Sequence, residues 1–200
     1  MSRRLNVAGL VLAALTLVAS VAWAYPLVWA AMATVAPRAQ GSLLDGLGVY
    51  ADALLNTPIG LWYLNSLVTS GTVTAVVIGI SAAAGYAISQ LEFRGRKLLW
   101  GVILASFMIP VQALIVNHFL LMNSWKLINT WAGVILPQLI APVAVIVYKQ
   151  FFDSMPRELG EAARVDGASH ARVLWNIYLP ANWGVTAALS IIVFIGAWNA

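Results

Sequence analysis

Few residues in this 200-residue sequence have side chains that could carry chemistry. The chain contains seven Asp and Glu, two His and no Cys, which excludes disulfides, thiolate nucleophiles and Cys-ligated metals. With only His118 and His170 as imidazole ligands, we expect no metal site. The amide and imidazole groups well inside the apolar stretches are those of Gln112, Asn117, His118 and Gln138. The absence of acidic residues and His pairs there argues against an intramembrane enzyme and against an ion-coupled transporter.

The charged residues that could act together lie between residues 153 and 180. Pro156 suits the first turn of a helix, which Asp153 or Ser154 could cap. Glu158 would favour the positive end of the helix dipole. Spacing of i, i+3, i+4 and i+7 then predicts one face that holds Leu159, Ala162, Ala163 and Asp166.

This predicted helix has a clear stop signal followed by a second start signal. Gly167 can take the left-handed conformation that ends a helix. Ser169 can cap a second short helix that runs through Trp175, and Pro180 would end it. The pattern predicts a helix–Gly–helix hairpin from which Glu161, Arg164 and Arg172 project polar groups.

Composition places this hairpin in a membrane protein. Hydrophobic residues make up 62 % of the chain and charged residues 9 %, against about 45–50 % and 25 % in soluble domains. Such a chain cannot cover a water-facing surface, so a soluble enzyme and a disordered chain are both excluded. The net charge of +4 comes from basic residues in short gaps between apolar runs, which indicates membrane topology rather than a nucleic-acid patch.

The long charge-free stretches predict an all-α, polytopic transmembrane helix bundle. The five spans expected from them are 6–30, 66–90, 98–121, 131–150 and 183–200. The first could also be a signal peptide with a cleavage site at Ala22–Ala24. However, Tyr25–Trp29 continues the apolar run beyond that site, so we favour an uncleaved span followed by a flexible external loop that includes Gly46–Ala51.

The distribution of Lys and Arg predicts the orientation. With the N-terminus in the cytoplasm, only Arg38 and Lys126 lie outside. The basic residues that then lie inside, with the hairpin, are Arg3, Arg4, Arg94, Arg96, Lys97, Lys149, Arg157, Arg164 and Arg172. This follows the positive-inside rule. The sequence stops as the fifth span ends, so we expect a truncated chain that lacks at least one further span.

Two features inside the spans suggest how they pack and bend. Small residues recur every four positions in the second span and predict a helix-packing stripe of Gly71, Ala75, Gly79, Ala83 and Ala87. Pro110 in the third span, and Pro137 and Pro142 in the fourth, predict bends. Bent helices suit a gated pathway, but they also suit an ordinary packed bundle.

The hairpin carries a recognisable motif. Glu161-Ala162-Ala163 is followed after three residues by Gly167, and after nine more by Ile177-x-Leu179-Pro180. This resembles the EAA signature of the inner-membrane permease subunits of binding-protein-dependent ABC importers. The resemblance implies that the ATPase-coupling residues are Glu161, Ala162, Ala163, Asp166, Gly167, Ile177, Leu179 and Pro180.

Further segments over residues 60–200 are similar to the maltose-type smaller permease of carbohydrate importers. They are Asn65–Leu67, Gly85–Ala87, Phe93–Arg96, Ile109–Pro110, Asn129–Thr130, Pro156–Leu159 and Asp166–Ser169. Departures at Asn117–His118 and Ser124–Lys126 fall at the expected outer face and leave the substrate open. Such permeases usually have six spans, against five here.

The resemblance implies a division of labour. Residues 1–60 would form the first span and the external loop, and residues 61–200 the transporter core with its coupling loop at 153–180. The expected partners are an ATPase dimer, a second permease subunit, an extracytoplasmic solute-binding protein and the lipid bilayer of a bacterial inner membrane, with no nucleic acid. The chain has no P-loop, so ATP would be bound by the partner, and we expect no cofactor and no catalysis here.

The substrate implied is a sugar or oligosaccharide. The same type of permease could instead carry glycerol phosphate, a polyamine or phosphate, and the sequence does not decide between them. A structural or receptor-like membrane protein is a more distant alternative, against which the EAA hairpin argues.

Overall fold

The computed structural model describes residues 7–35 and 43–200, and every regular element in these ranges is a helix. The all-α prediction is therefore confirmed for this part of the chain. The count of basic residues on each side of the membrane includes three that lie outside the described residues, namely Arg3, Arg4 and Arg38. The chain divides into two compact units, Met1–Trp62 and Tyr63–Ala200.

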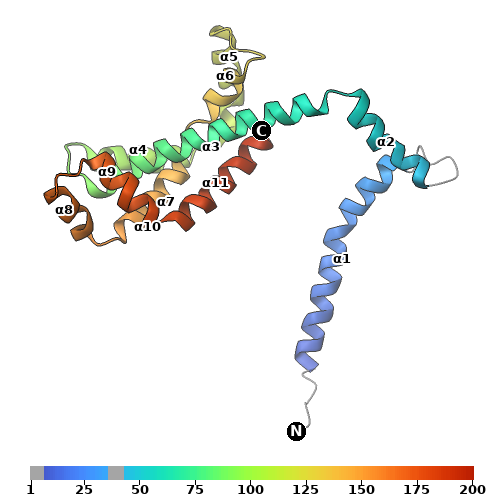
Figure 1. The fold of residues 1–200 in the computed structure, drawn as a ribbon, viewed down its shortest axis with the longest axis horizontal. Helices are drawn as coiled ribbons and strands as arrows, with labels where there is room; N and C mark the ends of the chain where they lie inside the picture. Colours follow the sequence, from blue (N-terminus) through green and yellow to red (C-terminus); the bar gives the residue numbers. More distant parts are fainter. Residues whose placement is uncertain (1–6, 36–42) are drawn as a thin grey trace. The chain divides into compact units, whose positions relative to one another are not determined.

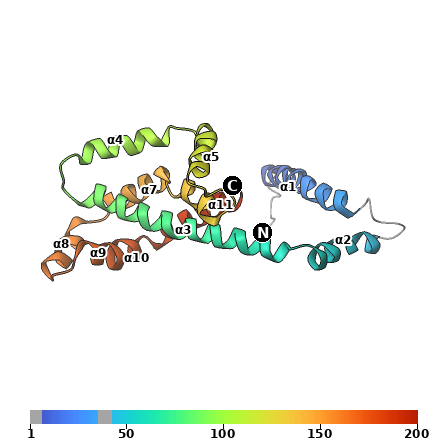
Figure 2. The ribbon, with the colours of Figure 1, turned by 90° about the horizontal axis from the view of Figure 1, so that it is seen from above.

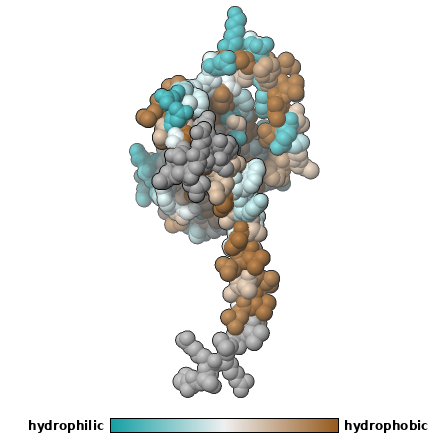
Figure 3. Space-filling view, turned by 90° about the vertical axis from the view of Figure 1, so that its right-hand side faces the viewer, coloured by the Kyte–Doolittle hydropathy of each residue, from teal (hydrophilic) through white to brown (hydrophobic). Residues whose placement is uncertain are grey.

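The described part of the first unit contains two complete helices and the start of a third. Helix α1 (Val7–Val35) is apolar on all sides, and the part of its surface that is visible in Figure 3 is mostly hydrophobic. A helix of this kind needs an apolar surrounding, as predicted for the first span. Helix α2 (Leu43–Asn56) covers Gly46–Ala51, so the prediction of a flexible loop there was wrong. Leu and Ala dominate this segment and favour a helix despite its two glycines.

The second unit is built on one long helix, α3 (Ile59–Gln90), which begins seven residues before the predicted span (Figure 1). The remaining elements in chain order are α4 (Arg96–Phe107), η2 (Val111–Leu114), α5 (Ile115–Ser124), α6 (Trp131–Ile135), η3 (Leu136–Gln138), α7 (Pro142–Asp153), α8 (Arg157–Val165), α9 (His170–Val173), the π-helical turn η4 (Leu174–Tyr178), α10 (Leu179–Ala181) and α11 (Trp183–Trp198).

The predicted spans lie in helices, but the third and fourth are broken, and a sharp bend precedes the fifth. Helices α1 and α3 are each long and apolar enough to cross a membrane, and counting each bent pair as one span brings the number to as many as five. The α4–α5, α6–α7 and α10–α11 breaks bend the chain by 90°, 47° and 87° respectively. Pro110 has an extended backbone (ψ 128°), so it interrupts the predicted third span instead of merely bending a continuous helix.

The last break also differs from the prediction. Pro180 lies in the first turn of α10 and does not end the second hairpin helix at Trp175. The helix continues through η4 to Ala181, and the direction changes at Asn182 (φ −113°, ψ 31°). The wide π-helical turn directly before Pro180 lets the helix continue past a residue that has no N–H to donate.

The core lies where the C-terminal halves of α3 and α7 meet the segment from α9 to α11. Figure 2 shows α7 between α3 and α4, with α8 to α10 on the other side of α3. Buried core side chains include Val73, Val77, Tyr148, Phe152, Val173, Tyr178 and Leu189. Helices α3 and α7 approach so closely at Gly85 that a Cβ there would lie 2.7 Å from the Tyr148 Cβ. Large apolar side chains elsewhere, such as Met108 and Ile140 (both 82 % exposed), suit contact with lipid.

Candidate functional site

The start of α8 shows how the hairpin leaves α7. Pro156 is the N-cap residue and no side chain caps the helix, so the predicted caps at Asp153 and Ser154 were wrong. Both residues still belong to the end of α7. The Ser154 hydroxyl donates to the Phe151 carbonyl at 2.7 Å, and the Asp153 carboxylate accepts from Ser89 at 2.6 Å and from Lys149.

The end of α8 forms a Schellman motif, as the glycine predicted. Gly167 has φ +84°, a left-handed conformation that costs a glycine little. The Ala168 N–H donates to the Ala163 carbonyl at 2.9 Å and the Gly167 N–H to the Arg164 carbonyl at 3.0 Å, the two bonds that define the motif. Ser169 then caps α9, as predicted, by accepting from the Arg172 N–H. Together these bonds fix the turn between the two hairpin helices.

The second helix of the hairpin packs on α3 and α7 through aromatic rings. The Tyr178 ring meets Tyr86 of α3 and Phe152 of α7 edge-on, with centroids 5.2 and 5.4 Å apart. Tyr178 is 1 % exposed and Phe152 is fully buried. Gly160 of α8 lies against the same tyrosine, since a Cβ there would be 3.2 Å from the Tyr178 hydroxyl. Tyr178 therefore contacts both hairpin helices and both supporting helices.

Hydrogen bonds join the same elements. The Tyr178 hydroxyl donates to Gln90 Oε1 at 2.9 Å, and Gln90 Nε2 donates to the Phe152 carbonyl at 2.9 Å. Tyr86 and His170 are paired through the Tyr86 hydroxyl and His170 Nδ1 at 3.2 Å. We call the group Tyr86, Ser89, Gln90, Phe152, Asp153, His170 and Tyr178 the anchor network. It fastens the hairpin to the ends of α3 and α7.

Asp153 at the edge of the anchor network has a pKa below its ordinary value. Partial burial by itself raises the pKa, but the hydrogen bonds from Lys149 and Ser89 and the positive charges of Lys149 and Arg96 outweigh it. The carboxylate is therefore held in its ionised form beside the end of α7.

The structure divides the EAA residues into two groups. Glu161, Ala162, Asp166 and Gly167 are exposed, as is Pro180. Ala163 and Ile177 are half-buried, and Leu179 is 7 % exposed in the core. Among the described residues Glu161 forms no ion pair. It lines a cleft of about 340 Å³ together with Arg157, Arg164, His170 and Tyr178.

Most of the small-residue stripe of α3 makes no close contact with the other described helices, although Ala87 at its end is half-buried. Cβ atoms built at Gly71 and Gly79 would meet nothing within 4 Å, and Ala75 and Ala83 are exposed. The stripe thus stays a predicted packing face. Sequence reasoning missed the close contact at Gly85, which lies outside the four-residue repeat, and it missed the anchor network. The one feature of the sequence that pointed to the anchor network was the polar pair Ser89–Gln90 at the end of an apolar span.

Two helices, α1 and α3, are apolar and long enough to cross a bilayer, and a polar hairpin packs on the ends of α3 and α7. These features define a polytopic helical membrane protein. The chain belongs to the family of binding-protein-dependent transport system inner membrane components, whose profile matches residues 75–200. It is thus a transport component of the bacterial inner membrane.

Relatives within this family are permease proteins. The chain is 37 % identical over 144 residues to the sn-glycerol-3-phosphate transport system permease protein UgpE of Yersinia pestis, covering 72 % of this chain and 51 % of the relative. It is 34 % identical over 138 residues to the arabinooligosaccharides transport system permease protein AraQ of Halalkalibacterium halodurans, covering 69 % and 50 %. The chain spans about half the length of these curated relatives.

A solved structure has the same fold. It is the crystal structure of a bacterial ABC transporter involved in the import of the acidic polysaccharide alginate. The match has a TM-score of 0.85 at 22 % identity and covers 100 % of this chain and 74 % of that one.

Proposed function

We propose that the chain is a non-catalytic permease subunit of an ABC importer and forms part of the path for a sugar or oligosaccharide. A separate ATPase subunit binds and hydrolyses ATP. The observation that carries the proposal is the hairpin, because it exposes the charged α8 while its second helix, from α9 to α10, buries one side in the core. The buried side chains of that helix are Val173, Leu174, Tyr178 and Leu179. A surface loop that does not transmit movement to the membrane helices needs no such buried contacts with α3 and α7.

The hairpin transmits movement in this proposal. Glu161 projects from α8 and pairs with a basic group in a cleft of the ATPase. When the ATPase subunits close, they displace α8, and Tyr178 and Gln90 pass the displacement to α3 and α7 through direct contacts. The breaks at Pro110 and Asn182 are the points where the remaining helices can change direction.

The N-terminus and the hairpin lie in the cytoplasm in this proposal, which the nine-to-two distribution of basic residues supports. A reporter fused after Lys97 should read cytoplasmic and one fused after Asp45 external. The opposite result would place the hairpin on the wrong side for an ATPase.

Two further partners complete the importer. The second permease subunit packs on the stripe from Gly71 to Ala87, of which the described helices of this chain leave Gly71, Ala75, Gly79 and Ala83 open. Ala75 and Gly79 also line a groove of about 520 Å³ with Trp175 and Trp183. A solute-binding protein delivers substrate near α5 and α6, at the end of α3 that lies away from the hairpin.

Glycerol phosphate is the second candidate substrate. The similarity to UgpE favours it, whereas the similarity to AraQ favours an oligosaccharide. Uptake of labelled arabino- and malto-oligosaccharides and of glycerol 3-phosphate, compared between a deletion strain and its complemented parent, separates the two. Loss of sugar uptake alone supports the first candidate, and loss of glycerol 3-phosphate uptake alone overturns it.

The coupling role is tested with Glu161→Ala. Glu161 is exposed, so its loss should leave stability within about 0.5 kcal/mol. The substitution would leave the basic group in the ATPase cleft without its ion-pair partner, which should weaken binding of the ATPase by about 2–5 kcal/mol. We therefore expect normal membrane insertion, lost uptake and little co-purifying ATPase. Lys126→Ala, at another exposed charge, should change neither. If Glu161→Ala keeps both uptake and ATPase, the docking role is wrong.

A further inference from the structure

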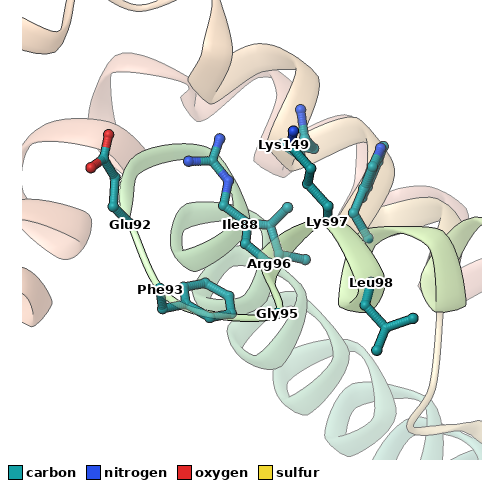
Figure 4. A pocket seen from close by; sticks show the side chains of 9 residues that line it. Ile88, Glu92, Phe93, Gly95, Arg96, Lys97, Leu98 and Lys149 are labelled. Carbon is teal, nitrogen blue, oxygen red and sulfur yellow. The ribbon is translucent and has the colours of Figure 1, made fainter.

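A second site lies beside the hairpin, in the angle between the α3–α4 turn and α7. It is a pocket of about 630 Å³ to which α3, the turn, α4 and α7 all contribute. Three of the lining side chains are basic, namely Arg96, Lys97 and Lys149, and its apolar walls include Ile88, Phe93 and Trp100. Figure 4 shows the three basic side chains extending toward one side of the turn, with Phe93 and Leu98 on the other.

Contacts within the chain use only part of this basic cluster. Arg96 donates to the Leu91 and Ser89 carbonyls at 3.2 and 3.3 Å, which leaves three of its five N–H groups. Lys149 pairs with Asp153 and lies 4.9 Å from the centre of the Trp100 ring. Lys97 is exposed and forms no hydrogen bond or ion pair with any described residue. The pocket therefore offers several donors to an anion.

The charges of the pocket are unfavourable without a ligand. Arg96 and Lys97 are the first two residues of α4, whose first turn contains no acidic residue, and cations are disfavoured at the positive end of a helix. Glu92 is the one acidic residue among the lining side chains, and its carboxylate lies at the far edge in Figure 4. Asp153 is paired with Lys149 from outside the pocket, so three cations face two carboxylates and the pocket keeps one positive charge, that of the unpaired Lys97.

The position of the pocket says what kind of anion fits. The apolar length of α3 ends at Gln90, and α4 starts a new apolar helix at Arg96 after the turn at Gly95 (φ +89°). The pocket therefore lies where membrane-spanning helices meet the polar surface. Its cations suit a phosphate, and its apolar walls suit a hydrocarbon chain. A free phosphate ion would use only the first of these features.

We propose that the pocket between the α3–α4 turn and α7 binds an anionic phospholipid, with the headgroup phosphate on Arg96, Lys97 and Lys149 and the acyl chains along Ile88, Phe93 and Trp100. Basic pockets between helices at a membrane surface are typical sites for such headgroups. The bound lipid holds α4 against α7 next to the anchor network. This site does not depend on the transported substrate or on the ATPase.

The test uses the purified protein in neutral detergent, with native mass spectrometry to count bound lipids. The probes are dioleoyl-phosphatidylglycerol, dioleoyl-phosphatidylcholine and inorganic phosphate. Lys97→Gln should weaken phosphatidylglycerol binding about fivefold, the factor expected for one basic residue near an anionic surface. Lys97→Arg should restore it. Arg94→Gln is the matched control, because Arg94 is exposed in the same turn but does not line the pocket.

The outcomes separate the sources of binding. Preference for phosphatidylglycerol over phosphatidylcholine that falls with Lys97→Gln and not with Arg94→Gln supports the site. Equal losses in both variants would indicate diffuse attraction to the basic surface and overturn it. Equal binding of both lipids, or full competition by inorganic phosphate at matched concentration, would also overturn it. Because uptake is not measured, none of these outcomes bears on the transport proposal.

Discussion

The two ends of the bundle formed by residues 63–200 are built differently. At the hairpin end, Phe152 and Tyr178 are almost fully buried and hydrogen bonds join α3, α7 and η4. At the other end of α3, the segment from η2 to η3 buries only Met122. Its contact with α3 there is a hydrogen bond from Trp131 Nε1 to Asn65 Oδ1 at 3.2 Å. The hairpin end is one packed body, while the other end leaves most of its surface to neighbours.

The largest effect should come from separating α3 and α7 at the packed end. A side chain at Gly85 would meet the Tyr148 Cβ at 2.7 Å and the Lys149 backbone N at 3.0 Å. Overpacking of this kind costs about 1–3 kcal/mol, and more where backbone must move. Gly85→Leu should therefore lower the thermal unfolding temperature of the purified protein clearly.

Gly79→Leu is the matched control for this prediction. A Cβ at Gly79 meets nothing within 4 Å, so monomer stability should change by less than about 0.5 kcal/mol. Loss of the co-purifying second permease in Gly79→Leu would support the proposed packing stripe. Equal destabilisation by both variants would contradict the contrast between the two faces of α3.

The next effect concerns the turn that joins the hairpin helices. Gly167 has φ +84°, and a side chain in the left-handed region costs about 1–2 kcal/mol. Gly167→Leu should displace α9 relative to α8, so that the protein inserts normally but loses uptake and holds the ATPase weakly. Gly167→Asn, which tolerates this conformation better, should retain more of both. A fully active Gly167→Leu would show that the turn geometry does not matter for coupling.

A smaller effect should come from the anchor network. Tyr178→Phe keeps the aromatic ring but removes the hydroxyl that donates to Gln90. The loss should be about 1 kcal/mol, with faster amide exchange in α8 to α10 than in wild type. The double variant Tyr178→Phe/Gln90→Leu should cost less than the sum of the two single variants, because both single changes remove the same hydrogen bond. Simple additivity of the two changes would mean that the hydrogen bond does not couple the helices.

The smallest effect should be an acid dependence at Asp153. Its pKa in the folded protein lies below the ordinary 3.8, so its ionised form adds stability above that pH, and the contribution is lost as pH falls through the lowered pKa. The side chain is 40 % exposed, which limits the contribution to about 0.5 kcal/mol. The stability difference between wild type and Asp153→Asn should be constant above pH 5 and shrink below pH 4. A difference independent of pH would show that the charge is not what matters.

The elements that could be predicted are those whose signals are local in the sequence. Gly167 and Ser169 fix the hairpin turn through bonds to residues within five positions, so their types alone predicted it. The spans followed from runs of apolar residues. The anchor network could not be predicted in this way, because Tyr178 and Gln90 lie 88 positions apart and meet only once α3 and η4 are packed.

The helix breaks could be predicted only in part. Pro110 predicted an interruption, but the 90° angle of the α4–α5 pair depends on where α5 packs. The break at Asn182 had no local signal, because the nearby Pro180 was the stronger candidate and is accommodated within α10. Helix α2 was missed since its two glycines suggested a loop, although its other residues favour a helix.

The π-helical turn at Leu174–Tyr178 changes the phase of the helix that contains it. The buried residues around it form two pairs five positions apart, Val173 with Tyr178 and Leu174 with Leu179. At 3.6 residues per turn, five residues advance a helix by about 500°, which would point the partners of each pair about 140° apart. The i→i+5 bonding of a π turn brings them back onto one side. Deleting a single residue between Val173 and Tyr178 would leave each pair four positions apart. At 3.6 residues per turn four residues advance a helix by about 400°, so an ordinary α-helix would then keep both pairs on one side, and α10 and α11 would keep their phase against the core.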